Sequence, residues 1–152
     1  MLGRKSKYEK RDYLKQFKIG KATYSESLIY EAYGGLQNDG IMLAVYYDVD
    51  AAKIIHQLDS WEKINDSPTI SSILKNVSSY FGLDFVIPEI ASGNFFLYDN
   101  SQHKELRSEA EMNTLLLHSE DVNFSLVVWD DEKHTIYIVC LLYTSPSPRD
   151  CS

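Results

Sequence analysis

Cysteine, proline and glycine are scarce in this chain of 152 residues, which contains two, four and seven of them. Both cysteines, Cys140 and Cys151, lie near the C-terminus, so residues 1–139 cannot form a disulfide or a thiolate metal site. No window reaches the roughly 18 apolar residues of a membrane span, and the N-terminus lacks the apolar run of a signal peptide. We therefore expect a cytoplasmic protein without a membrane span.

Several motifs that identify enzymes are also missing. The sequence has no Gly-rich phosphate loop of the Walker or Rossmann kind and no nucleophile elbow. Its four histidines show no pair at the spacing of a helical zinc site: His56, His103, His118 and His134. We therefore expect no cofactor, unless carboxylates bind a divalent metal such as Mg²⁺.

The C-terminal residues have an unusual composition. The peptide "CLLYTSPSPRD", residues 140–150, resembles the translation of a transposase adapter used in sequencing libraries. The adapter base before this frame falls in the third position of the Val139 codon, where any base encodes valine. We therefore interpret residues 140–152 as a non-native tail, Val139 as the last native residue, and the preceding domain as truncated at its C-terminus.

Charge divides the chain into two parts. Residues 1–21 carry eight basic and two acidic side chains, a balance of +6, whereas residues 22–139 carry six basic and nineteen acidic side chains, a balance of −13. We interpret these parts as a basic N-terminal arm or helix and a single domain of ordinary size. Because an acidic domain repels polyanions, we expect a basic protein partner and no nucleic-acid partner.

The basic arm has two interpretations. Its lysines could bind nucleic acid or an anionic membrane. Alternatively, Tyr13, Leu14 and Phe17 form the inner face of a helix that ends at Gly20, with the charged face solvated or docked on the acidic domain. We favour this second interpretation.

Hydrophobic spacing predicts helices and strands in an irregular order. Helices are expected in the arm and at 23–33, 51–60, 68–81 and 108–116. Strands are expected at 41–47, 84–87, 94–98, 124–129 and 135–139, with the second and third paired across a turn at 91–93 and the last two forming a C-terminal hairpin, 123–139. This order predicts an α+β fold with a mostly antiparallel sheet of about five strands packed with four to five helices.

Two pairs of aspartates follow predicted strands. In "MLAVYYDVDAA", residues 42–52, the predicted strand is followed by Asp48 and Asp50. In "LVVWDDE", residues 126–132, the predicted strand is followed by Asp130 and Asp131. If Asp48 and Asp50 are in extended backbone, both side chains leave the same face and can hold a divalent cation.

These aspartates carry two resemblances to enzyme families. An Asp-x-Asp after a first strand and an acidic pair after a later one resemble the haloacid-dehalogenase phosphatases, although Ala51 and Ala52 replace the Thr or Val expected next. Gly34 and Gly35 followed by Asp48 and Asp50 resemble the polymerase-beta-like nucleotidyltransferases, although Gly34 ends a predicted helix instead of opening one.

The resemblances imply a phosphoryl- or nucleotidyl-transferring enzyme that depends on a divalent metal. Asp48 would be the nucleophile or a metal ligand, Asp50 the acid/base or second ligand, and Asp130 with Asp131 further ligands. The alternative is structural: Asp48 ends a strand, Asp50 caps a helix, and the other two are turn residues. We favour this alternative, with no catalytic or metal-binding residues, and expect a non-catalytic protein-binding domain of the immunity or regulator kind.

Overall fold

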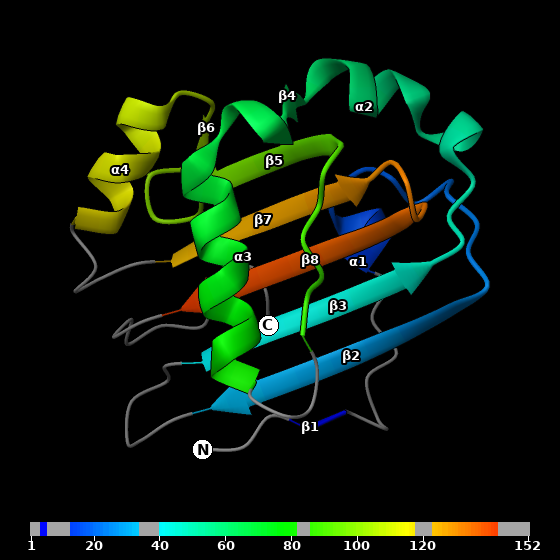
Figure 1. The fold of residues 1–152 in the computed structure, drawn as a ribbon, viewed down its shortest axis with the longest axis horizontal. Helices are drawn as coiled ribbons and strands as arrows, with labels where there is room; N and C mark the ends of the chain where they lie inside the picture. The colour runs from blue at the N-terminus through cyan, green and yellow to red at the C-terminus, as the bar shows by residue number, and fades with distance from the viewer. Residues whose placement is uncertain (1–3, 6–12, 34–39, 82–85, 118–122, 143–152) are drawn as a thin grey trace.

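The fold is a single antiparallel sheet with helices on both faces (Figure 1). The computed structural model describes residues 4–5, 13–33, 40–81, 86–117 and 123–142. Within these residues it has eight strands and four α-helices, which confirms a mixed α+β fold with an antiparallel sheet. The sheet has more strands than the five expected. Among the helices described, none combines the length and apolarity that crossing a membrane requires.

The strands follow one another across the sheet in an order different from their order in the chain. From one edge to the other they are β1 Arg4–Lys5, β2 Glu26–Tyr33, β3 Gly40–Tyr47, β8 Thr135–Leu142, β7 Asn123–Asp130, β5 Gly93–Asp99 and β4 Glu62–Lys63, while β6 Lys104–Leu106 also pairs with β5. Because β3 and β7 both run antiparallel to β8, they are parallel to each other. Their carboxyl ends therefore lie at the same end of the sheet.

The helices divide between the two faces of this sheet. They are α1 Tyr13–Gln16, α2 Ile55–Ser60, α3 Pro68–Phe81 and α4 Glu109–Leu117, with 3-10 helices at Ala51–Lys53 and Ile64–Asp66. Figure 1 shows α3 crossing the strands in front, whereas α1 lies behind them. The first face packs against α3 and α4, and the second packs against α1 and α2.

Each face of the sheet has its own hydrophobic core. On the first face, Leu43 of β3 and Leu126 of β7 pack in one cluster with Ile70 of α3. On the second face, Ala44 and Val127 pack in another cluster with residues of α1 and α2. A strand buried on both faces needs apolar side chains at successive positions, which accounts for the apolar sequence of β3.

Two helices with clear capping signals are confirmed. The side chain of Ser67 accepts a hydrogen bond from the backbone N–H of Ile70 at 3.2 Å and so caps α3. Ser108 and Glu111 form a capping box at the start of α4, in which Glu111 N–H donates to Ser108 Oγ at 3.1 Å and Ser108 N–H donates to Glu111 Oε1 at 3.3 Å. Local sequence decides both helix starts.

The helix predicted at 23–33 is wrong, because residues Glu26–Tyr33 form strand β2. This strand pairs along its whole length with β3, from Glu26 opposite Tyr47 to Tyr33 opposite Gly40. The apolar residues of this segment fit a helical spacing, but Ile29 lies in the second core and Tyr30 packs against the first, which is the alternation between faces that a strand requires. Pairing with β3 decides between the two patterns.

The strand predicted at 84–87 is also wrong where the structure describes it. Residues 86–90 have no regular structure, while 84–85 lie outside the described residues. The next strand, β5, begins at Gly93 and pairs with β4, β6 and β7. Gly93 is therefore a strand residue and not part of a hairpin turn. Pro88, which follows the predicted strand, has no backbone N–H to donate to a neighbouring strand.

The described end of the basic arm docks on its own domain. Tyr13 and Leu14 are each 1% exposed in the second core, and Phe17 packs against it, as expected for the inner face of a helix. The helix ends earlier than predicted: α1 stops at Gln16, and Lys18, not Gly20, departs from helical backbone with a φ of 66°. Residues 1–3 and 6–12 of the arm lie outside the described residues.

Two further boundaries differ from the sequence prediction. The helix expected at 51–60 is split at Ile54, and the side chain of Ile55 is 46% exposed. The strand expected at 135–139 continues to Leu142, because Cys140 and Leu141 pair with both β3 and β7. Backbone pairing does not require a particular sequence, so the non-native tail at 140–152 stays a prediction.

Candidate functional site

The two predicted aspartate pairs lie at the same end of the sheet, on strands that are separated by β8. Asp48 and Asp50 follow β3, and Asp130 and Asp131 lie at the end of β7 and the start of the turn to β8. The backbone N–H of Val49 donates to the carbonyl oxygen of His134, in that turn, at 2.8 Å. This hydrogen bond links the two segments that carry the aspartates.

The aspartates after β3 serve the local backbone. Asp48 is exposed, accepts a hydrogen bond from the hydroxyl of Ser25, and has a φ of 54°. The extended backbone assumed for Asp48 is therefore wrong. Asp50 Oδ1 accepts from Ala52 N–H at 3.1 Å and caps the 3-10 helix Ala51–Lys53, which confirms its capping role.

The aspartates after β7 are turn residues, as the structural interpretation predicted. Asp130 is 1% exposed, and its Oδ1 accepts from the N–H groups of Glu132 at 3.0 Å and Lys133 at 3.1 Å. Asp131 is exposed and accepts from the indole Nε1 of Trp129 at 3.4 Å. Asp130 thus closes the turn between β7 and β8.

A metal site needs several ligand side chains close together, and this requirement can be compared with the residues that the structure describes. Among them, no group of three or more His, Cys, Asp or Glu side chains is placed to hold one. Burial, together with the charge of Asp130 and the neighbouring Tyr47, raises the pKa of Tyr137 well above its ordinary value of 10.0. Tyr137 is therefore a neutral phenol at neutral pH and not a base.

A pocket of about 540 Å³ lies on the second face of the sheet, over β5. Its volume is within the range of small-molecule sites. Its walls come from α1 and the residues after it, from α2, from β5, β6 and β7, and from the turn after β5. The sequence predicts no pocket here, although Phe17 and Lys18 belong to the basic arm that was considered for nucleic-acid or membrane contact.

Aromatic side chains line one wall of this pocket. Phe96 and Tyr98 alternate with Phe95 and Leu97 along β5, so the first two face the pocket while the other two are buried in the opposite core. The rings of Phe96 and Tyr98 are 6.3 Å apart and nearly parallel, at 16°. The ring of Trp61 lies 6.1 Å from that of Phe96, at 31°. We call Trp61, Phe96 and Tyr98 the aromatic row.

Buried polar groups form another part of the lining. Asn100 and Ser125 line the pocket and are 3% and 1% exposed. Asn100 Nδ2 donates at 3.0 Å both to Ser125 Oγ and to Asn123 Oδ1. Asn123 is 2% exposed, and its Nδ2 has no hydrogen-bond partner among the described residues. Polar groups this deeply buried hold their orientation through each other.

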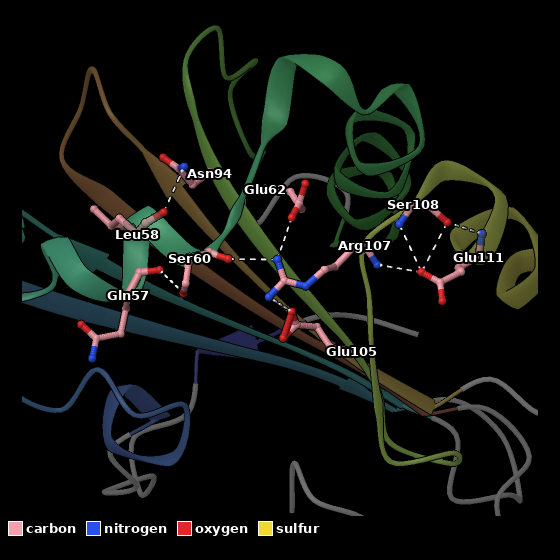
Figure 2. A network of polar contacts seen from close by, with 9 residues as sticks. All are labelled: Gln57, Leu58, Ser60, Glu62, Asn94, Glu105, Arg107, Ser108 and Glu111. Carbon is pink, nitrogen blue, oxygen red and sulfur yellow. Dashed lines mark hydrogen bonds and ion pairs between the residues drawn. The ribbon is translucent and has the colours of Figure 1, made fainter.

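Arg107 ties together the elements beside the pocket (Figure 2). Its Nη1 donates to the carbonyl of Ser60 at 3.0 Å and pairs with Glu62 Oε2 at 2.7 Å, and its Nη2 pairs with Glu105. Its backbone N–H donates to Glu111 Oε1 at 3.1 Å. One guanidinium thus joins the end of α2 to β4 and β6. Because the pairs are about half exposed, we expect them to orient these elements and to add little stability.

Comparisons with known proteins show no family for this chain, so the proposals about its function depend on the geometry of the structure. No family model matches this sequence, and no curated protein or solved structure shows significant similarity to it. A sequence signal for the pocket does exist in "GNFFLYDN", residues 93–100, where aromatic and amide side chains share one face of a strand. The proposals below depend on where the fold places side chains of this kind.

Proposed function

We propose that this chain is a non-catalytic protein-binding domain, of the immunity or regulator kind, that recognises a basic protein. The proposal is supported mainly by the meeting of two acidic segments at the end of β3 and β7. Asp48, Asp50 and Asp131 are exposed there, close to an exposed Glu132. Residues 22–139 add the wider acidic surface, with a balance of −13.

The local roles of these aspartates are compatible with binding. A carboxylate can accept about four hydrogen bonds. Asp50 can therefore cap its helix and still accept from a lysine or arginine of a partner. Charge complementarity of this kind accelerates encounter and selects against acidic partners. The capping hydrogen bond from Ala52 N–H also fixes Asp50 before a partner arrives, which lowers the entropic cost of binding.

The test compares two double variants of equal charge. Asp48→Asn with Asp50→Asn removes two charges but keeps side chains that tolerate left-handed backbone and cap helices. Asp59→Asn with Glu89→Gln removes two charges from exposed positions on α2 and in 86–90. The partner is first captured from the source organism with the wild-type chain and identified.

We expect the first double variant to bind this partner about tenfold more weakly and the second to change affinity less than about twofold. The affinity of the wild-type chain should fall as salt rises. Equal losses in both variants, or capture of acidic proteins alone, would contradict the proposal.

A divalent-metal enzyme is the second candidate, since the two predicted aspartate pairs do lie at one end of the sheet. In that case Asp48, Asp50 and Asp130 would bind Mg²⁺ and a phosphate-containing substrate. The measurement is a thermal shift on adding Mg²⁺ to the wild-type chain and to Asp48→Ala. A shift that the variant loses would favour the enzyme over the binding domain, and no shift in the wild-type chain would remove it.

A further inference from the structure

We propose that the pocket over β5 binds a neutral saccharide ring, whose apolar face packs on the aromatic row. This proposal does not depend on the basic-protein partner, because the pocket lies on the second face of the sheet and not at the end that carries Asp48 and Asp50. The two can therefore succeed or fail separately.

The arrangement of the aromatic row indicates the shape of the ligand. Trp61, Phe96 and Tyr98 follow one another along one wall, with neighbouring ring centres 6.1 and 6.3 Å apart. A flat base would have to enter between two rings, but Phe96 and Tyr98 already stack on each other with their centres 6.3 Å apart. A continuous wall instead suits a ligand with one apolar face, as the C–H groups of a pyranose provide.

The polar groups suit the edge of such a ring. Gln57 of α2 offers an amide at the wall that both donates and accepts. The donors of Asn100 and Ser125 are engaged with Asn123 and with each other, so Asn100 offers its carbonyl oxygen as an acceptor. Sugar hydroxyls also donate and accept, so they match groups of this kind. Because Asn100 is already oriented by its hydrogen bonds to Ser125 and Asn123, it presents this oxygen with little loss of side-chain entropy.

The charges of the pocket indicate a neutral ligand. The lining has one lysine, Lys18, and one carboxylate, Glu105, and Glu105 is paired with Arg107. A cation would meet Lys18 with little to oppose it, while a phosphate would approach a chain of net charge −7. An uncharged ligand meets neither obstacle.

Calorimetric titration of the full chain tests this proposal. The probes are maltose, cellobiose, lactose and chitobiose, each at up to about 10 mM, and a soluble polysaccharide built from whichever unit binds. Adenosine and an arginine-containing tripeptide are the competing probes. We expect saturable binding of at least one disaccharide. Tighter binding of the polysaccharide would identify the ligand as a glycan chain instead of a free sugar.

The variants separate the pocket from the rest of the surface. Phe96→Ala should weaken binding at least tenfold, which corresponds to about 1.4 kcal/mol. Tyr24→Ala is the matched control, because Tyr24 is an exposed aromatic outside the pocket lining, and it should leave the affinity unchanged. If Phe96→Ala does not fold, Gln57→Ala, which alters a partly exposed helix residue, replaces it and should also weaken binding.

Several results would overturn the proposal. One is the absence of saturable binding for all four disaccharides to the folded wild-type chain. Another is binding of adenosine or the tripeptide that Phe96→Ala abolishes, since the pocket would then take a base or a cation. A sugar affinity that Tyr24→Ala lowers as much as Phe96→Ala would place the site elsewhere.

Discussion

Val49 donates its backbone N–H to the carbonyl oxygen of His134 at 2.8 Å, between two segments that carry left-handed residues. Asp48 precedes Val49 with a φ of 54°, and His134 itself has a φ of 51°. Left-handed backbone costs a residue with a Cβ about 1–2 kcal/mol. The acidic end of the sheet therefore depends on strained backbone at two positions.

Replacing Asp48 tests this strain directly. Asp48→Gly and Asp48→Ala both lose the hydrogen bond from Ser25, but only glycine adopts the left-handed conformation without cost. We expect Asp48→Gly to be more stable than Asp48→Ala by about 1 kcal/mol in urea denaturation. At Asp59, within α2, the order should be reversed by a similar amount, because glycine weakens a helix. The same order at both positions would show that strain at Asp48 is not the cause.

Asp130 should be the most important of the four aspartates for stability. Its removal in Asp130→Ala leaves two turn N–H groups, those of Glu132 and Lys133, without their acceptor. We expect a loss of about 1–3 kcal/mol in the free energy of unfolding. Asp131→Ala, at an exposed position, should change it by less than about 0.5 kcal/mol. Equal losses would mean that the turn does not need the Asp130 carboxylate.

Gly93 should not tolerate a side chain. A Cβ at this position would lie 1.9 Å from the carbonyl oxygen of Trp129 in the paired strand β7. Gly93→Ala must therefore push β5 and β7 apart, and we expect it to cost about 3 kcal/mol or more. Ala91→Gly, in the preceding bend, is the control and should cost less than about 1 kcal/mol. A stable Gly93→Ala with an unchanged thermal midpoint would contradict this close approach.

Local signals in the sequence predicted some elements well. Ser67 and the Ser108–Glu111 pair mark α3 and α4, because a helix start depends on side chains within three residues of it. Asp50 was recognised as a cap for the same reason. The segment of β2 predicts a helix because Leu28, Ile29, Ala32 and Tyr33 fit a helical spacing, and only pairing with β3 makes it a strand. Pairing with a distant strand cannot be predicted from the sequence of one segment alone.

The two candidate sites also differ in how far they can be predicted from the sequence. The acidic end can be predicted because Asp48 and Asp50 are close in the chain, and the parallel arrangement of β3 and β7 places Asp130 at the same end of the sheet, across β8. The pocket combines residues from α1, α2 and β5, which are separated by long stretches of sequence. Phe96 and Trp61 become neighbours only after the sheet has formed.

Acid should destabilise this fold through Glu109, which joins the N-termini of α3 and α4. Burial would raise the pKa of Glu109, but hydrogen bonds from Ser67 and Thr69 outweigh it and lower the pKa below its ordinary value of 4.5. A carboxyl whose pKa is lower in the folded state binds fewer protons there than in the unfolded state. It therefore stabilises the fold above pH 4.5, and this contribution is lost as the pH falls through 4.5 toward the folded pKa.

Unfolding in urea at a series of pH values measures this effect. The free energy of unfolding of the wild-type chain should decrease as the pH falls below 4.5. Glu109→Gln should be less stable at neutral pH and show a weaker dependence on pH, because glutamine has no proton to gain. Glu89→Gln, at an exposed position, should keep the wild-type slope. If Glu109→Gln kept that slope as well, the acid sensitivity would have to come from other carboxylates, among which Glu111, whose pKa is also lowered by hydrogen bonds from the backbone of Arg107 and Ser108, is the next to replace.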